Sequence, residues 1–176
     1  MRLRYLIIAA SLLATSSLAA NQTLEQYELD NTLLKAQLAI ESRDYDKAFQ
    51  LYNQAARWGH KGAQYVVGEM YIRGEGTEQN EVMGLAWLEV AAEARDREFI
   101  KARNKAEQSL TDTEIENADA VAEKIASAYG MEAAQVTCRQ ELRVGSNIKV
   151  TNCYHTHVTR DTILVPEEQG DFLAQL

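Results

Sequence analysis

The chain has 176 residues, of which 18 are basic and 26 acidic, and its formal net charge at pH 7 is −8. An acidic surface repels phosphate backbones and anionic lipid headgroups, so this charge argues against nucleic acid and membrane surfaces as partners and favours a basic protein partner or simple solubility. A chain of this length can bury one core, as a single domain or a domain with an appendage.

The first 20 residues have the pattern of a secretory signal peptide. Arg2 and Arg4 precede an uncharged run, from Tyr5 to Ala20, that is rich in Leu, Ile and Ala and ends in small residues. Its strongly apolar part is too short for a membrane span, which needs about 20 apolar residues. We therefore expect removal of residues 1–20, leaving a periplasmic or secreted chain of about 156 residues with no membrane span.

Residues 45–56 have apolar or small side chains at the spacing of an amphipathic helix. Asp44 precedes this segment at the position of an N-cap, and Gly59 follows it at the position of a C-cap. The chain has one proline, near the C-terminus, so nothing in this region interrupts a series of helices.

A helix hairpin is expected next, with its first helix at residues 61–73 and its second at residues 80–94. Gly74 and Gly76 turn the chain between the two helices. Gly68 lies inside the first helix, where glycine costs about 1 kcal/mol relative to alanine. We interpret Gly68 as a point where a neighbouring helix packs closely.

A third helix pair follows, at residues 97–110 and 112–129. Thr111 or Asp112 is placed to cap its second helix, with Glu114 in the first turn, and Gly130 ends it. The helical segment at residues 45–56 also matches the helix at residues 80–94 at a shift of 36 residues. A period in this range is typical of a helical solenoid. The matching residues are Phe49 with Leu85, Tyr52 with Leu88, and Ala55-Ala56 with Ala91-Ala92.

The unit at residues 63–96 resembles the Sel1-like repeats, which are close relatives of the tetratricopeptide repeats. We expect this chain to be an exported bacterial protein of that kind. The residues that carry this resemblance are Ala63, Val67-Gly68, Tyr71, Gly74, Gly76, Gly84, Trp87 and Ala91-Ala92. Val67 and Gly84 replace a leucine and an alanine of the family pattern. Residues 30–59 resemble a more divergent, tetratricopeptide-like unit. The resemblance implies a mainly α fold, a short α-solenoid over residues 21–130.

Solenoids of this type bind proteins or peptides on the concave side, which the first helix of each unit lines. The resemblance therefore implies a binding surface on that helix. The residues that pack between units are Tyr71, Trp87, Leu88, Ala91 and Ala92. A solvated face without function is the alternative for the binding surface. The implied binding residues are Tyr65, Glu69, Ile72 and Arg73, with Leu33 and Gln37 in the first unit.

Residues 131–176 are expected to form a small β-hairpin appendage. Residues 136–144 alternate apolar with polar, and residues 148–154 form the return strand after Gly145-Ser146, which favours a type II′ turn with glycine first. This turn pairs Cys138 with Cys153, and an exported chain with two cysteines is expected to form one disulfide. The apolar faces do not match in that register, so a bulge or a longer loop is the alternative. A third strand is possible at residues 162–165.

A second function class comes from alternating ligand types near the end of the return strand. Cys153, His155 and His157 would lie on one face of a strand, and imidazole and thiolate ligands bind copper or zinc. A disulfide at Cys153 would remove the thiolate. Metal binding through His155 and His157 is therefore the alternative to protein binding.

Catalytic motifs are missing from the sequence. It has no Gly-rich phosphate loop, no G-x-S-x-G and no H-E-x-x-H, so a small hydrolase ranks last and no cofactor is expected. The sequence as a whole predicts a non-catalytic adaptor that binds a protein or peptide of the bacterial cell envelope.

Overall fold

The computed structural model of the protein describes residues 26–156. The expected signal peptide, the possible strand at residues 162–165 and His157 lie outside this range. Residues 26–41 form a helix. The elements that follow are α2 (Tyr45–Arg57), α3 (Lys61–Arg73), α4 (Glu81–Ala92), α5 (Arg97–Glu107), α6 (Asp112–Tyr129), β1 (Val136–Leu142) and β2 (Lys149–His155).

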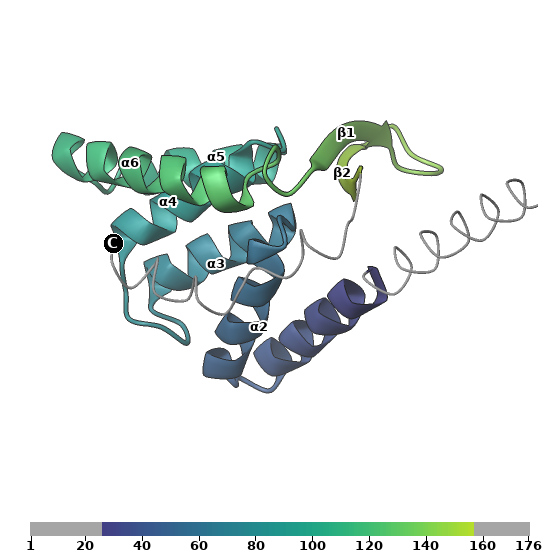
Figure 1. Cartoon of the computed structure of the whole chain (residues 1–176), viewed down its shortest axis with the longest axis horizontal. Coiled ribbons are helices and arrows are strands. Elements are labelled where there is room, and N and C mark those ends of the chain that lie inside the picture. Colours follow the sequence, from purple (N-terminus) through teal and green to yellow (C-terminus); the bar gives the residue numbers. More distant parts are fainter. Residues whose placement is uncertain (1–25, 157–176) are drawn as a thin grey trace, which may run out of the picture.

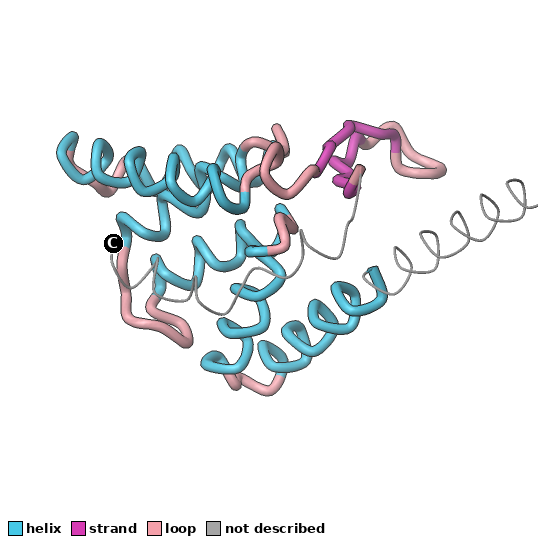
Figure 2. Tube along the Cα trace, viewed as in Figure 1, coloured by secondary structure: helices cyan, strands magenta, loops and turns pink. Residues whose placement is uncertain are grey.

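The helices stack as successive antiparallel pairs, as expected for an α-solenoid. The 26–41 helix and α2 lie at one end of the stack, α3 and α4 lie in the middle, and α5 and α6 lie at the other end (Figure 1). Short turns join most of the helices, and a longer loop connects α3 to α4 (Figure 2). The helix boundaries agree with the sequence periodicity to within a few residues.

Side-chain caps fix where the helices begin. The Asp44 carboxylate accepts a hydrogen bond from the backbone N–H of Lys47 at 3.3 Å, which confirms it as the N-cap of α2. Thr111 and Glu114 form a capping box at the start of α6, also as expected. Gly59 follows α2 with φ +79°, the left-handed conformation that favours glycine after a helix.

Two glycines let α3 and α4 approach each other closely. A Cβ atom added at Gly68 would lie 2.8 Å from Cγ of Leu88 and 2.9 Å from the carbonyl oxygen of Gly84. A Cβ added at Gly84 would lie 2.5 Å from Cγ1 of Ile72. The expected close packing at Gly68 is therefore confirmed.

The main core cluster lies between the layers of helices. Trp87 is completely buried, and its ring stacks on that of Tyr129 with centroids 6.2 Å apart. Leu88 and Ala91 are also completely buried, and Tyr71 packs against the same cluster as Trp87. These residues have the packing role that the resemblance to repeat proteins implied.

The two strands form an antiparallel hairpin in the expected register. Cys138 is opposite Cys153, and the two residues form a disulfide. The mismatched apolar faces need no bulge, because Leu142, Val144 and Ile148 are exposed to solvent near the tip. The expected type II′ turn is wrong: the N–H of Ser146 donates to the carbonyl oxygen of Arg143, so Gly145 is the third residue of its turn.

The hairpin projects from the helical stack (Figure 1) and is anchored at its base. The N–H of Thr156 donates to the carbonyl oxygen of Gln135 at 2.8 Å and closes the base of the hairpin. The Gln140 amide donates to the carbonyl oxygen of Arg95, between α4 and α5, at 3.2 Å and connects the hairpin to the helices. Within residues 26–156, no helix is long and apolar enough to cross a membrane.

Candidate protein-binding surface

The α3 helix carries four of the expected binding residues. Arg73 is half exposed, and its guanidinium lies 3.1 Å from the carboxylate of Glu69 and 3.3 Å from that of Glu75. Exposed ion pairs of this kind contribute little to stability, about 0–1 kcal/mol each. Arg73 is therefore an accessible cation that can exchange its partners for those of a bound chain.

Tyr65 pairs with an aromatic residue that the sequence analysis missed. Its ring stacks on Phe99 of α5, with centroids 5.0 Å apart and an interplanar angle of 21°. Partial burial raises the pKa of Tyr65, with smaller contributions from the carboxylates of Glu69 and Glu98, while Arg73 acts in the opposite direction. The stacked pair links the first helices of two successive units.

Phe99 had a detectable signal in the sequence. It lies 34 residues after Tyr65, close to the period of the repeat, and so occupies a similar position in the third pair. The pair at residues 97–129 lacks a G-x-G turn. The periodicity alone therefore did not show which of its residues correspond to those of the pair at residues 61–94.

Ile72 lies partly buried on the side of α3 that faces α4. It packs, like Tyr65, against the cluster that contains Leu85 and Leu88. Ile72 therefore contributes mainly to the packing of α3 against α4 and less to the exposed surface of α3.

The two candidates in the first unit have different surroundings from those on α3. Leu33 is partly buried against the main core cluster around Trp87, whereas Tyr65 and Ile72 belong to the second cluster. Gln37 is exposed and donates a hydrogen bond to Glu41 at 3.3 Å. Leu33 is therefore held against the main core, whereas the Gln37 side chain is exposed.

The structure describes only part of the alternative metal site, because His157 lies outside residues 26–156. Cys153 forms a disulfide with Cys138, so its thiolate is not available as a ligand. Nδ1 of His155 lies 3.2 Å from the carbonyl oxygen of Ala134. Across residues 26–156, no three side chains of the His, Cys, Asp and Glu types form a group that could hold a metal ion.

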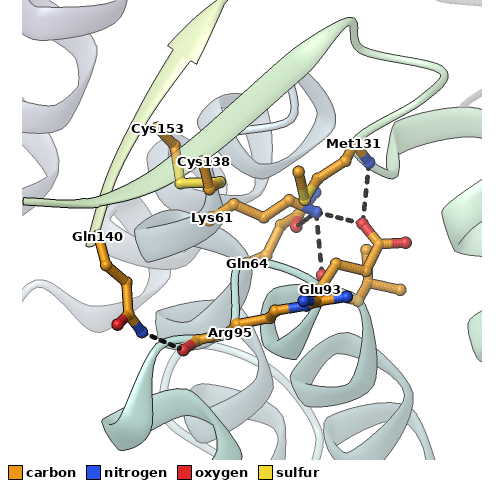
Figure 3. Close-up of a disulfide and its surroundings, with 9 residues drawn as sticks. Lys61, Gln64, Glu93, Arg95, Met131, Cys138, Gln140 and Cys153 are labelled. Carbon is orange, nitrogen blue, oxygen red and sulfur yellow. Dashed lines mark hydrogen bonds and ion pairs between the residues drawn. A yellow bond between two sulfur atoms is a disulfide. The ribbon is translucent and has the colours of Figure 1, made fainter.

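A buried lysine forms the centre of a polar network next to the main core (Figure 3). Nζ of Lys61 donates to Oε1 of Gln64 and to the carbonyl oxygen of Val90, both at 2.9 Å, and to Oε2 of Glu93 at 2.7 Å. The same Glu93 oxygen accepts from the N–H of Met131. Burial lowers the pKa of Lys61, and the pairing with Glu93 opposes this shift.

All three donor hydrogens of the Lys61 ammonium have acceptors within the protein. The network therefore has no free donor for a substrate, and its role is to join α3, α4 and the segment that leads to the hairpin. Sequence analysis missed this network because the partners of Lys61 lie up to 32 residues away.

The comparison with family models decides the nature of the repeat. The family model described as Sel1 repeat matches residues 38–60 and 62–96. The chain is therefore similar to Sel1 repeats over these two segments. The second match coincides with the unit expected at residues 63–96, and the first extends over the more divergent unit before it.

The structural comparison supports the same fold. The chain is similar to the crystal structure of c5321, described as a protective antigen present in uropathogenic Escherichia coli strains and displaying an SLR fold. The TM-score is 0.55 and the sequence identity is 22%, over 65% of this chain and 27% of the other. The chain thus spans about a quarter of the length of that protein. No curated protein matches the chain. Sel1 repeat folds are generally scaffolds for protein–protein interaction rather than enzymes.

Proposed function

We propose that the protein is a non-catalytic adaptor that binds a protein or peptide of the bacterial cell envelope through the α3–α5 surface. We define this surface by Tyr65, Glu69, Arg73 and Phe99. The observation that carries the proposal is the stacked pair of Tyr65 and Phe99, because Tyr65 lies on the same helix as the half-exposed Arg73, about two turns before it. Tyrosine and arginine are among the residues that contribute most to binding energy at protein interfaces.

The charges around this surface favour a particular kind of partner. Glu69 and Glu75 supply two carboxylates beside Arg73, and Glu98 supplies a third that acts on Tyr65. A segment with an apolar or aromatic side chain for the ring pair, and a basic side chain for the carboxylates, complements this arrangement. The acidic composition of the whole chain supports the same kind of partner.

Two features support a location in the cell envelope. The first 20 residues have the composition of a signal peptide. The Cys138–Cys153 disulfide is of a type that persists in oxidising compartments such as the periplasm. In this proposal residues 21–130 form the binding domain, and residues 131–176 form an appendage that begins after α6.

The test is an in-cell cross-linking pull-down from the envelope fraction. The wild-type protein is compared with the double variant Tyr65→Ala, Arg73→Glu, and circular dichroism checks that the variant remains folded. The control is Lys101→Glu with Lys124→Glu, which changes two exposed lysines outside the surface.

We expect the wild type and the control to capture the same partner and the Tyr65/Arg73 variant to lose it. A partner that all three proteins retain would show that binding uses another surface. The proposal would then fail even though the repeat fold stands.

A further inference from the structure

Exposed large apolar side chains gather at only two places in the described residues, and those two places carry opposite charge. One is the outer face of the 26–41 helix, which we call the N-terminal patch. The other is the outer part of the β-hairpin, which we call the hairpin patch. Tyr27, Leu34 and Leu38 form the first group, and Leu142, Val144 and Ile148 form the second, whereas the exposed Tyr154 lies at the base of the hairpin.

The N-terminal patch is an apolar stripe with acidic edges. Tyr27, Leu34 and Leu38 are separated by seven and four residues, so they lie on one face of the helix. Each of the three is more than half exposed. Asp30 and Glu41 fall on the same face at helical spacing, and residues 26–41 hold three acids and one base.

The hairpin patch is apolar with basic neighbours. Val144 is fully exposed at the tip, and Leu142 and Ile148, each about 60% exposed, flank the tip on opposite faces of the hairpin. Arg143 and Lys149 lie directly beside them, and residues 136–155 hold three basic residues and one acid. The hairpin is therefore a positive element in an acidic chain.

We propose that the hairpin patch of one copy of this chain docks on the N-terminal patch of a second copy. Each patch offers apolar area that is unfavourable in water, and the basic residues of one meet the acidic residues of the other. Contiguous exposed apolar side chains on a folded chain commonly mark an interaction site. This association uses different residues from the α3–α5 surface and is independent of the proposed function.

The arrangement of the two patches favours contact between copies over contact within one. The hairpin tip remains exposed in the single chain, so it does not reach its own N-terminal patch. Figure 1 shows the hairpin projecting beyond the helices next to α6, whereas the 26–41 helix lies at the other end of the stack. A pair of copies related by a two-fold axis, in which each tip lies on the other copy's helix, would use both patches of each copy.

The test measures the mass of the purified protein by analytical ultracentrifugation over a range of concentrations. We expect a concentration-dependent shift from monomer to dimer that weakens at high salt, because the contact includes exposed opposite charges. Two charge-reversed proteins follow, Arg143→Glu with Lys149→Glu, and Asp30→Lys with Glu41→Lys. Each should be monomeric alone, since its two patches then repel each other.

Mixing the two charge-reversed proteins is the decisive step. In the mixture each altered patch meets its complement on the other protein, so a heterodimer should form although neither protein associates with itself. The matched control, Lys101→Glu with Lys124→Glu, should dimerise like the wild type. A wild-type protein that stays monomeric, or a mixture that fails to associate, would overturn the proposal. So would a monomer that binds vesicles of anionic lipid through the hairpin tip.

Discussion

Nζ of Lys61 lies 2.7 Å from Oε2 of Glu93, and only 2% of the lysine side chain is exposed. An ammonium group this deeply buried is stable only when its charge and its hydrogen bonds are matched, because transfer of an unpaired charge out of water is costly. Glu93 supplies the charge, and its second contact with Met131 carries the same interaction to the segment that leads to the hairpin. One carboxylate therefore connects two helices and the appendage.

Removing the Glu93 carboxylate should destabilise the whole helical stack. We expect Glu93→Ala to lower the free energy of unfolding by about 2–3 kcal/mol, because it leaves the Lys61 ammonium buried without its counter-charge. Urea unfolding followed by circular dichroism measures the change. Glu116→Ala, at an exposed acid of α6, is the control and should change stability by less than about 0.5 kcal/mol. Equal effects of the two variants would argue against the network.

Stability should fall in mild acid because of His60. Its Nδ1 accepts a hydrogen bond from the N–H of Ala63 at 3.0 Å as the N-cap of α3. Burial lowers the pKa of His60, His155 lowers it further, and Asp30 opposes both. The unfolded state then binds more protons below pH of about 6.5, so the free energy of unfolding decreases as the pH falls through this region.

The variant His60→Asn isolates that effect. Asparagine is a good N-cap and does not titrate, so the variant should show a shallower loss of stability between about pH 6.5 and pH 5. Denaturant unfolding at a series of pH values gives the comparison. Parallel pH profiles for the wild type and the variant would show that other groups cause the acid sensitivity.

Loss of the disulfide should loosen the hairpin and leave the helices intact. In the chain-entropy model, the 15-residue separation of Cys138 and Cys153 corresponds to about 3 kcal/mol. We expect amide hydrogen exchange in β1 and β2 to accelerate about a hundredfold in Cys138→Ser with Cys153→Ser. Amides of α3 and α4 serve as the internal reference. If their exchange accelerated equally, the hairpin would be part of the global folding unit.

A methyl group at Gly68 should disrupt the contact between α3 and α4. Alanine is favoured in a helix by about 1 kcal/mol, but its Cβ would lie 2.8 Å from Cγ of Leu88 and against backbone of α4. The clash should dominate, and we expect Gly68→Ala to lower the free energy of unfolding by about 1–2 kcal/mol.

Gly62 provides the matched comparison for Gly68. A Cβ atom there would have the side chain of His60 as its nearest neighbour, with Cε1 at 3.1 Å. A small shift of that ring relieves the contact, so Gly62→Ala should change stability much less than Gly68→Ala, although the ring also caps α3. Thermal unfolding of both variants gives the sign of each change in stability. A Gly68→Ala protein as stable as the wild type would contradict the close approach of α3 and α4.

The helical part of the fold was accessible from local sequence signals. Asp44, Thr111 and Gly130 mark helix ends through interactions within a few residues, and these signals placed the helices to within a few residues. The hairpin register followed from Cys138 and Cys153. The turn type was wrong because a glycine with positive φ fits more than one position of a tight turn.

The parts that sequence analysis missed depend on distant residues. Lys61 and Gln64 are polar positions in the first turn of a helix, a pattern typical of solvent exposure, yet both are buried. Their partners come from α4 and from the end of α6, and no local pattern identifies such pairs. Phe99 and Leu33 show the same limitation for the binding surface, because their places depend on how successive pairs stack.

Gln64 has a consequence for how the protein folds. Its amide nitrogen donates to the carbonyl oxygen of Ala56 at 3.0 Å and to that of Tyr129 at 2.8 Å, so one side chain of the middle pair joins the first pair to the last. In long repeat arrays each unit interacts with its immediate neighbours alone, and the ends can unravel one unit at a time. Here the last turns of α2 and α6 share one buried amide, so the three helix pairs should gain and lose their structure in a single cooperative transition.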